Sequence, residues 1–406
     1  MNFDTTIAAA GEDLLGRNQA GAPRPPRLAL ICDFLEERWP SMDLFGDMLF
    51  RSFTAEHASA IEVEQLRPAL RHRFSKLPGL GRAGFFWNAD RLLNRFHDYP
   101  VWLKKRAANF DLFHIVDHSY AQLVLDLPAE RTVVTCHDLD TFLCLLEPEL
   151  DPRPRWFRAM AQRSLNGFVR AAQVICPSAF TKANVLRHGL IPPDRVTVIH
   201  PGADPVFFAF NDPVPAVDRP YLLHVGSTIR RKRIDVLLRV FARVACEFPD
   251  LQLMRVGGDF TAEQSRLAED LGVADRIVQS PHLTKPQLAA VYRQAAIVLQ
   301  TSDAEGFGLP VVESMASGCP VISSDIAPLR EAGGAAAEYC PVGDIEAWSG
   351  TVIRLLRERK ADPETWELRR GRARRHASCY TWSENANRTM DVYQRVCKSS
   401  AWMPRP

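Results

Sequence analysis

Two glutamates, Glu305 and Glu313, flank a glycine-containing turn and form the most informative chemical pattern of the chain. Both lie in 303–325, DAEGFGLPVVESMASGCPVISSD, which follows an apolar run typical of a strand. Gly306 and Gly308 allow positive φ angles and the close approach of a ligand to the backbone. Because a carboxylate can accept two hydrogen bonds from vicinal hydroxyls, Glu313 suits a ribose and Glu305 a hexose lying across the turn.

A helix is expected to begin directly after this turn. Pro310 suits the first helical position, because the N–H that proline lacks would have no partner there. Gly318 then supplies the end of the helix. The N–H groups around Phe307, Gly308 and Leu309 lie at the positive end of the helix dipole, and this arrangement predicts a phosphate-binding site.

A second chemical pattern is the basic run 230–233, RRKR, which follows the strand-like segment YLLHVGS. Four cations at the start of a helix oppose its dipole and destabilise the isolated helix. A bound anion would explain the run, and a solvent-exposed group of charges is the alternative.

These residues must be positioned by a globular scaffold. Of 406 residues, 46% are apolar and 24% charged, which excludes a wholly disordered, collagen-like or coiled-coil chain. Because single cores stop growing at roughly 250–300 residues, the length favours two domains. Lysine and arginine total 50 against 48 acids, so the net charge of +2 gives no reason to expect nucleic acid as a partner.

The cysteines and the apolar runs indicate in which cellular compartment the protein is found. Nine cysteines form no C-x-x-C pair, and their odd number argues against a disulfide framework or a zinc site. The N-terminus has no long apolar segment, and no run of about 18 apolar residues occurs elsewhere. We therefore expect a cytoplasmic protein.

Short apolar runs alternate with longer amphipathic runs from residue 27 onward, which predicts parallel sheets covered on both faces. The expected fold is α/β, with two Rossmann-like, doubly wound domains facing a central cleft. Prolines and aspartates in 204–220 mark the boundary between them. The expected units are a flexible extension at 1–26, an N-terminal domain at 27–203, a linker at 204–219, a C-terminal domain at 220–378, and a helix and tail at 379–406 that is a candidate to pack back on the N-terminal domain.

The sequence resembles the retaining glycosyltransferases of family 4, which have the two-domain GT-B fold. The segment EGFGLPVVE has the full form of that family's E-x7-E motif. The resemblance runs from about residue 28 to residue 396 and includes FDLFHIVD, VVTCHD, ICPSAFTK, VTVIHPGAD, YLLHVGS, RRKR and TW.

The resemblance implies a donor site on the C-terminal domain, where Glu313 would bind the nucleotide ribose and Glu305 the donor sugar. The implied donor-binding residues are Gly226, Ser227, Arg231, Lys232, Glu305, Gly306, Phe307, Gly308, Leu309 and Glu313. Many members have an arginine where this chain has Ser227, which puts one diphosphate contact in doubt. Members with serine there retain the Arg-Lys pair at the spacing of Arg231 and Lys232.

The implied catalytic residues are Glu305, His137, Arg231 and Lys232. Arg231 and Lys232 would neutralise the departing nucleoside diphosphate. His137, a residue type that after a strand is often structural, would hydrogen-bond the donor hexose from the N-terminal domain. Asp138 would order the acceptor. The triplet 138–140 has the form of a DxD metal motif but lies in the histidine loop of the other half, so no metal is expected.

The function that the resemblance implies is a retaining, metal-independent transfer of a hexose, of mannose or glucose type, from a nucleoside diphosphate sugar. The acceptor would be a hydroxyl of a glycan or a lipid-linked molecule, and no cofactor is expected beyond the sugar nucleotide. A sugar-nucleotide epimerase and a non-catalytic sugar-nucleotide-binding scaffold remain the alternatives.

One segment of the N-terminal half suggests a membrane partner. Residues 67–106 contain ten lysines or arginines, with Asp90 and Asp98 as their acids, and interleaved aromatic residues. Cations attract anionic lipid while aromatic rings enter the headgroup boundary. A peripheral site at the inner face of the membrane is therefore a hypothesis, and a solvated segment with its aromatics in the core is the alternative.

Overall fold

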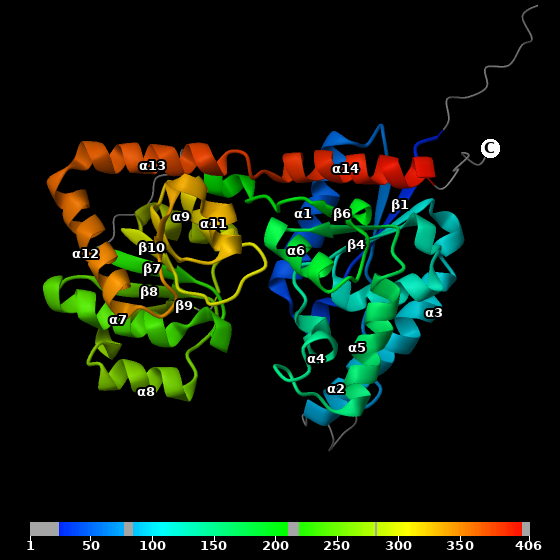
Figure 1. Cartoon of the computed structure of the whole chain (residues 1–406), viewed down its shortest axis with the longest axis horizontal. Helices are drawn as coiled ribbons and strands as arrows, with labels where there is room; N and C mark the ends of the chain where they lie inside the picture. The colour runs from blue at the N-terminus through cyan, green and yellow to red at the C-terminus, as the bar shows by residue number, and fades with distance from the viewer. Residues whose placement is uncertain (1–23, 77–83, 210–218, 281, 400–406) are drawn as a thin grey trace, which may run out of the picture.

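The computed structural model describes residues 24–76, 84–209, 219–280 and 282–399, and these form two α/β lobes side by side (Figure 1). Each lobe holds one six-stranded, all-parallel sheet surrounded by helices, which confirms the predicted fold class. Most of the expected extension, positions 210–218 of the expected linker and the tail at 400–406 lie outside the described residues.

The N-terminal sheet has the strand order β2-β1-β3-β4-β5-β6. Its strands are β1 (Arg27–Ile31), β2 (Glu62–Leu66), β3 (Leu112–Ile115), β4 (Thr132–Thr135), β5 (Gln173–Cys176) and β6 (Val196–Val198). Strands β3 and β4 are buried at every residue, as expected of parallel strands covered on both faces, although His114 and two threonines stand among their apolar residues.

The C-terminal sheet has the order β12-β11-β10-β7-β8-β9. Its strands are β7 (Tyr221–Val225), β8 (Gln252–Val256), β9 (Ile277–Ser280), β10 (Ile297–Gln300), β11 (Val321–Ser324) and β12 (Glu338–Cys340). The chain order reverses between the neighbours β7 and β10. Ligands of doubly wound sheets bind outside the carboxyl ends of the strands at such a reversal.

Helices cover the two sheets. Those of the first lobe are α1 (Pro40–Glu56), α2 (Gly84–Leu93), α3 (Tyr99–Lys104), α4 (Leu143–Leu146), α5 (Arg155–Phe168) and α6 (Ala179–Arg187). Those after the linker are α7 (Ile234–Glu247), α8 (Ala262–Asp270), α9 (Lys285–Gln294), α10 (Leu309–Ala316), α11 (Ala327–Gly333), α12 (Ile345–Ala361), α13 (Pro363–Ala377) and α14 (Trp382–Ser399). Short 3₁₀ turns at His118–Asp126 (η4) and Arg230–Lys232 (η9) follow strands β3 and β7.

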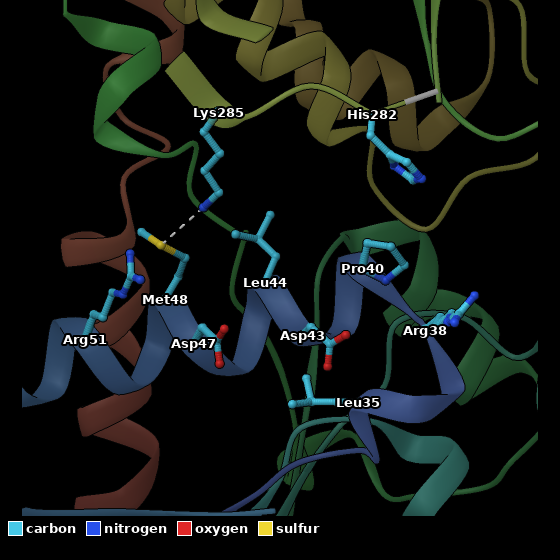
Figure 2. A pocket seen from close by; sticks show the side chains of 10 residues that line it. All are labelled: Leu35, Arg38, Pro40, Asp43, Leu44, Asp47, Met48, Arg51, His282 and Lys285. Atoms are coloured by element: carbon cyan, nitrogen blue, oxygen red, sulfur yellow. Dashed lines mark hydrogen bonds between the residues drawn. The ribbon is translucent and has the colours of Figure 1, made fainter. Parts of the chain in front are cut away.

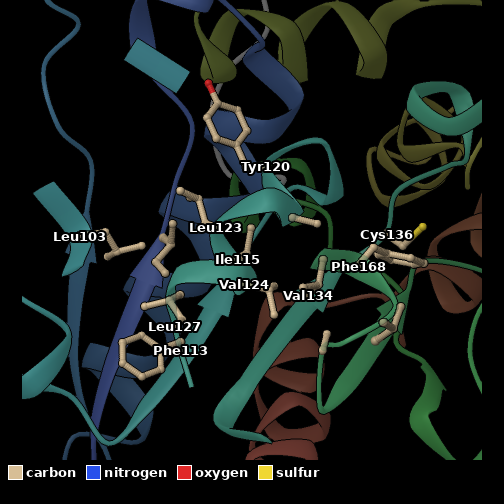
Figure 3. Packing of buried hydrophobic residues seen from close by; sticks show 14 of the residues in the cluster. Leu103, Phe113, Ile115, Tyr120, Leu123, Val124, Leu127, Val134, Cys136 and Phe168 are labelled. Carbon is tan, nitrogen blue, oxygen red and sulfur yellow. The ribbon is translucent and has the colours of Figure 1, made fainter. Parts of the chain in front are cut away.

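The core of the N-terminal lobe lies between its sheet and the helices η4 and α5 (Figure 3). Side chains of the central strands, such as Phe113, Ile115 and Val134, meet Leu123 and Phe168 there. This packing fixes the carboxyl ends of β3 and β4, from which the candidate residues of this lobe project.

The last helix, α14, crosses back and packs on the N-terminal lobe against α1 (Figure 1). Its Trp382, Met390 and Tyr393 join a core cluster with residues of β1 and α1. The hydroxyl of Tyr393 lies 2.6 Å from Nδ1 of the buried His114 on β3. The chain therefore connects the two lobes twice, once before β7 and once before α14.

Candidate active site

The loops after β7 and β10 meet at the reversal of the C-terminal sheet. The N–H of Asp303 donates to the carbonyl of Arg231 at 2.9 Å, and Oγ1 of Thr301 donates to the carbonyl of Lys232 at 2.9 Å. Two segments about 70 positions apart in the sequence are thus joined through their backbones. The contacts place the basic run beside the predicted donor-binding turn.

Glu305 is the centre of this arrangement. Its Oε1 accepts from Nζ of Lys232 at 2.5 Å, and its Oε2 accepts from Nη1 of Arg231 at 3.0 Å. Oε1 also accepts from Nε2 of Gln300 at 2.8 Å and from Oγ of Ser302 at 2.7 Å. Burial alone would raise the pKa of Glu305, but Lys232 and Arg231 outweigh it and lower that pKa, so the carboxylate is charged.

The basic run does not act as one group of four cations. Arg231 and Lys232 reach Glu305, whereas Arg233 turns away and pairs with Asp235 at 2.9 Å. Arg233 has a φ of 50°, which separates the short turn η9 from helix α7. The four cations therefore do not form one site: two of them bind Glu305, and Arg233 has its own carboxylate in the first turn of the helix.

The turn at 306–309 has the geometry that its glycines predict, although for two different reasons. Gly308 has a φ of 120°, and a Cβ there would lie 2.6 Å from Cδ2 of Leu329. Gly306 has no positive φ, but a Cβ there would lie 2.3 Å from the carbonyl oxygen of His137. Glycine is needed at 306 because a backbone of the opposite lobe touches it, not because of its own conformation.

Helix α10 begins at Leu309, so Pro310 occupies its second position. No side chain caps this helix, and no group in the described part of the chain accepts from the N–H of Phe307, Gly308 or Leu309. The free donors at the positive end of α10 are the predicted anion site.

Glu313 lies in the second turn of α10 and is buried, with 8% of its surface exposed. Its Oε2 accepts from the hydroxyl of Tyr292 at 3.0 Å. Burial raises the pKa of Glu313 to about 7, although the Tyr292 hydrogen bond and Lys285 favour the charged form. The two glutamates of the motif therefore differ: one is held ionised by two cations, and the other is half protonated near neutral pH.

His137 faces this site from the N-terminal lobe. Its Nε2 lies 2.8 Å from the carbonyl oxygen of Val116, and since a carbonyl can only accept, Nε2 carries the proton. In the neutral ring Nδ1 is then an acceptor. Phe45 packs edge-on against the imidazole with ring centroids 5.0 Å apart. The ring is thus fixed in orientation and tautomer.

Asp138 belongs to a chain of polar contacts that extends into the lobe. Its Oδ1 accepts from the N–H of Asp140 at 3.0 Å and lies 3.5 Å from Nε2 of the buried His118. Nδ1 of His118 lies 3.3 Å from Asp117. Burial opposes the charge on Asp117, but His118 and His137 lower its pKa to about 2. The buried carboxylate of Asp117 therefore interacts electrostatically with His118 after β3 and His137 after β4.

The two lobes are joined next to the donor-binding turn. Oγ of Ser178 donates to the carbonyl of Gly306 at 2.6 Å, and the N–H of Ala179, at the start of α6, donates to the carboxylate of Glu331 at 2.9 Å. The ring of His200 stacks on Phe307 with centroids 5.3 Å apart. These contacts hold the turn at 306–309 against the N-terminal lobe.

A pocket of about 600 Å³ lies between α1 and the beginning of α9 (Figure 2). Pro40, Asp43 and Leu44 line it from α1, while His282 and Lys285 line it from the C-terminal lobe. Nζ of Lys285 donates to Asp204 at 2.5 Å. Lys285 also acts electrostatically on Glu313, the carboxylate that is predicted to bind a ribose.

Sequence comparison agrees with this geometry in both lobes. The family profile described as "Glycosyl transferases group 1" matches residues 208–370, and the profile "Glycosyltransferase Family 4" matches residues 52–207. The chain belongs to the group 1, family 4 glycosyltransferases. The resemblance drawn from the E-x7-E motif is thereby confirmed.

Curated relatives of this glycosyltransferase chain match it over part of their length. The D-inositol 3-phosphate glycosyltransferase of Thermobispora bispora is 32% identical over 224 residues, which cover 50% of this chain and 51% of that protein. The enzyme of the same name from Mycolicibacterium smegmatis is 31% identical over 228 residues, covering 52% of this chain and 50% of that protein. The matched region thus spans about half the length of these relatives.

Solved structures share the fold of this glycosyltransferase chain at low identity. Sucrose-phosphate synthase from Thermosynechococcus elongatus has a TM-score of 0.70 and 21% identity, covering 92% of this chain and all of that chain. The Anabaena protein HepE in complex with UDP has a TM-score of 0.62 and 16% identity, covering 91% of this chain and all of that chain. Both likenesses show the GT-B architecture.

Sequence reasoning did not find several neighbours of the two glutamates in this glycosyltransferase chain. Gln300 is the last residue of β10 and Ser302 lies two positions after it, so polar residues at a strand end were the available signal. Tyr292 lies on another helix, 21 positions before its partner Glu313, so no spacing rule relates the two. Asp117 and His118 stand at the end of FDLFHIVDH, but the sequence does not indicate which side chains they contact. Their contacts with the loop after β4 depend on the pairing of β3 with β4.

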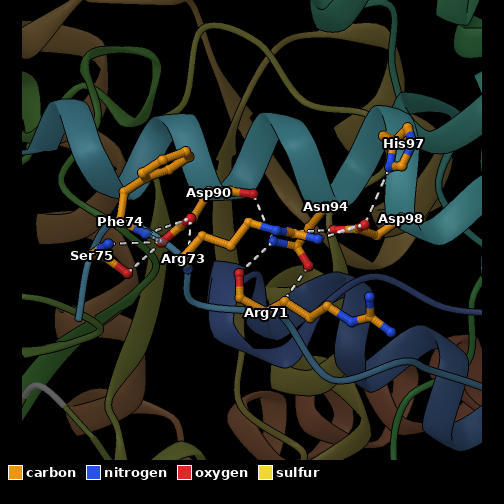
Figure 4. Close-up of polar contacts among 8 residues, drawn as sticks. All are labelled: Arg71, Arg73, Phe74, Ser75, Asp90, Asn94, His97 and Asp98. Atoms are coloured by element: carbon orange, nitrogen blue, oxygen red, sulfur yellow. Dashed lines mark hydrogen bonds and ion pairs between the residues drawn. The ribbon is translucent and has the colours of Figure 1, made fainter. Parts of the chain in front are cut away.

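The basic segment 67–106 is bound both to its own two acids, shown in Figure 4, and to acids outside it. Asp90 accepts from the backbone N–H groups of Arg73, Phe74 and Ser75, and Arg73 pairs with Asp98 at 2.6 Å. Arg67 and Arg91 pair with acids outside the segment. The net positive charge around this segment in the folded protein is therefore smaller than a count of its own residues indicates. Positions 77–83 lie outside the described residues, and no described helix is both long and apolar enough to cross a bilayer.

Proposed function

We propose that the protein is a retaining hexosyltransferase that moves a hexose from a nucleoside diphosphate sugar to a hydroxyl of a glycan or lipid-linked acceptor. The observation that carries the proposal is the pairing of Glu305 with both Arg231 and Lys232, next to the free N–H groups of the turn before α10. Two cations and a set of backbone donors suit a diphosphate.

The donor would lie along the C-terminal lobe. Glu313 would accept from the ribose hydroxyls, and the base would extend into the pocket beside Lys285. The diphosphate would lie between the turn at 306–309 and the pair Arg231 and Lys232. Because Glu305 already holds these cations, we propose that it aligns them for the leaving group and binds a sugar hydroxyl with a remaining lone pair of Oε2.

The acceptor would approach from the N-terminal lobe, past Asp138. His137 would accept a hydrogen bond at Nδ1 from a hydroxyl of the donor sugar, because its Nε2 donates to the carbonyl of Val116. Departure of the diphosphate is helped by Arg231 and Lys232, which stabilise the charge that develops on it. The departing oxygen would take the acceptor proton on the same face of the sugar, so the configuration is retained without a protein nucleophile or a metal ion.

The relatives support a transferase rather than another use of the same site. They are named for transfer to a phosphorylated inositol, and HepE is described in complexes with UDP and with UDP-glucose. We propose a hexose of glucose or mannose type for this chain. We propose that the acceptor is a hydroxyl-bearing glycan, lipid-linked molecule or polyol.

The test is a donor screen with purified protein. UDP-glucose, UDP-galactose, UDP-N-acetylglucosamine and GDP-mannose are each incubated with the protein, with and without an acceptor panel of myo-inositol phosphates and lipid-linked glycans. We expect one donor to release its nucleoside diphosphate, faster with acceptor, and the proton NMR spectrum of the product to show the donor's anomeric configuration. An inverted product would overturn retention, while epimerised donor without transfer would favour the epimerase.

Two variants separate catalysis from binding. Lys232→Ala should lose turnover, whereas Arg357→Ala, which removes an exposed ion pair with Glu247 in the same lobe, should not. Binding of a donor by the wild type, with no turnover on any acceptor, would favour the scaffold alternative.

We further propose a cytoplasmic protein that meets the membrane surface at the N-terminal lobe. Phe85, at the start of α2, is 75% exposed, more than any other large apolar side chain among the described residues of segment 67–106. The test is co-sedimentation with phosphatidylglycerol vesicles against phosphatidylcholine vesicles. Binding to the anionic vesicles that is weakened in Phe85→Ser supports the proposal, and equal recovery in the supernatant with both lipids contradicts it.

A further inference from the structure

A buried arginine lies beneath the donor site in the C-terminal lobe. Arg255, on β8, has 0% of its surface exposed, and no carboxylate of the described residues forms an ion pair with it. Its guanidinium donates to the carbonyls of Gly226 and Gly257 at 2.6 Å each, and also to the carbonyl of Gly258. Within the described residues, the hydrogen bonds of this buried positive charge thus all go to backbone carbonyls.

The position of Arg255 relates it to the predicted diphosphate site. It pairs in register with His224 on β7, directly before the loop that carries Arg231 and Lys232. A Cβ on Gly257 would lie 2.6 Å from the carbonyl oxygen of Gly226, and one on Gly226 would lie 3.6 Å from Cε of Lys232. The turns after β7 and β8 therefore touch each other and Lys232.

The carbonyls that face Arg255 determine where the neighbouring N–H groups point. In a trans peptide the C=O and N–H bonds are antiparallel, and no cis peptide occurs in the described residues. With the carbonyls of Gly226, Gly257 and Gly258 turned inward, the N–H groups of Ser227, Gly258 and Asp259 point outward. No group within the described ranges accepts from these three N–H groups, and all three residues are exposed.

We propose that Arg255 is a positioning residue for the diphosphate of the donor: it supplies positive charge from beneath and turns the N–H groups of Ser227, Gly258 and Asp259 toward the phosphates. The proposal rests on the proposed function and names a part of that site outside the E-x7-E turn. It also gives a structural reason why serine suffices at 227. The charge is supplied from β8 rather than from the side chain after Gly226.

The neighbouring charges agree with this role. Burial, Arg255 and Lys232 lower the pKa of His224 to about 3, so this histidine is neutral and adds no positive charge. Burial lowers the pKa of Arg255 to about 10, which leaves the guanidinium charged at neutral pH. Of the described acids, Glu305, Asp140 and Asp259 act on the cations at the ends of β7 and β8, and a diphosphate would bring further negative charge to the same cations.

Arg276 provides a matched control. It lies in the same lobe, at the amino end of β9 and so at the opposite end of the strands from the predicted donor site, and donates to the carbonyls of Ala245, Phe248 and Leu251 at 2.6–3.1 Å. Its guanidinium lies 5.6 Å from the ring of Phe241, as that of Arg255 lies 5.4 Å from Phe260. Both arginines bind backbone carbonyls, but only Arg255 lies at the predicted phosphate site.

The experiment compares ligands with and without a diphosphate by calorimetry. For Arg255→Gln we expect the dissociation constant of UDP or GDP to rise at least about tenfold while that of uridine or guanosine stays unchanged, since hydrogen bonds to charged groups are worth that much. Arg255→Lys should recover part of the loss, and Arg276→Gln should lower stability without changing either constant. Equal weakening of nucleoside and nucleotide, or no weakening, overturns the inference.

A second measurement does not depend on the folding of a variant. In the wild type, inorganic pyrophosphate should shift the backbone amide resonances of Ser227, Gly258 and Asp259. Shifts confined to the turn at 306–309 and to Lys232 would contradict the role of Arg255. A wild type that binds neither UDP, GDP nor pyrophosphate contradicts the proposed function, whereas nucleotide binding that Arg255→Gln leaves intact contradicts this inference alone.

Discussion

The carbonyl oxygen of His137 lies directly against the α-carbon of Gly306, although the two residues belong to different lobes. The contact leaves no room for a side chain: a methyl group on Gly306 would lie 2.3 Å from that oxygen. Two predicted catalytic elements, the histidine loop and the E-x7-E turn, are therefore in contact through their backbones, and their alignment depends on how closely the lobes approach.

Gly306→Ala should separate these elements without unfolding either lobe. A shift on the order of 1 Å relieves the clash, and misplacement of that size can lower turnover by about 100-fold. The measurement is kcat together with the unfolding temperature. Gly350→Ala is the control, because nothing lies within 4 Å of a Cβ at that helical glycine. A fully active Gly306→Ala protein would contradict the contact.

Lys232→Ala and Glu305→Gln should both lower kcat, by at least about 100-fold for the lysine, because charge stabilisation of a leaving group is worth that much. Lys232→Ala should also lower the free energy of unfolding by roughly 3 kcal/mol, since Glu305 then stays buried with one cation fewer. Kinetics and denaturant unfolding measure the two effects. Unchanged turnover in both variants would refute the assignment of the site.

The raised pKa of Glu313 makes stability depend on pH. Its pKa is about 7 in the folded protein against 4.5 in the unfolded chain, so the folded state holds the proton more tightly. Stability should therefore fall as pH rises from about 4.5 to 7 and then level off. Glu313→Gln keeps a partner for Tyr292 and should be more stable than wild type by roughly 3 kcal/mol at pH 8, with little difference at pH 4.5. A constant difference would count against the shift.

His224 should contribute to unfolding by acid. Its folded pKa is about 3 against 6.5 for an ordinary histidine, so below pH 6.5 the unfolded chain binds a proton that the folded protein does not. Stability should fall by about 1.4 kcal/mol per pH unit below 6.5 from this group. His224→Leu removes the titration, so its denaturant stability should decline less steeply between pH 6 and pH 4. Parallel slopes would show that the residue is not neutral in the native state.

The fold and half of the site could be predicted from sequence because they rest on local patterns. Buried strands such as β4 and β10 are short runs rich in apolar and β-branched residues, and the E-x7-E turn keeps its glycines, proline and acids within nine residues. Strand order could not be predicted in this way, because the pairing of β7 with β10 depends on how the whole sheet packs.

The ion-pair and hydrogen-bond partners of charged residues could not be predicted from the sequence. Counting charges over 67–106 missed Glu37 and Asp43, which neutralise Arg91 and Arg67 from the segment before it. Arg255 was not identified either, because strand alternation places it on the face of Leu251 and Leu253 but nothing in LQLMRVGG indicates which groups accept its hydrogen bonds. Only the turns of Gly226 and Gly258, folded over its guanidinium, show that it is buried.

The return of α14 to the first lobe has a consequence for synthesis. The core cluster around β1 and α1 includes Trp382, Met390, Tyr393 and Val396, which leave the ribosome after every strand of both sheets. The lobe whose strands emerge first is thus the last to complete its core, while the second lobe has all its strands and α13 beforehand. Until then, the apolar face of α1 must remain exposed or be protected by a chaperone.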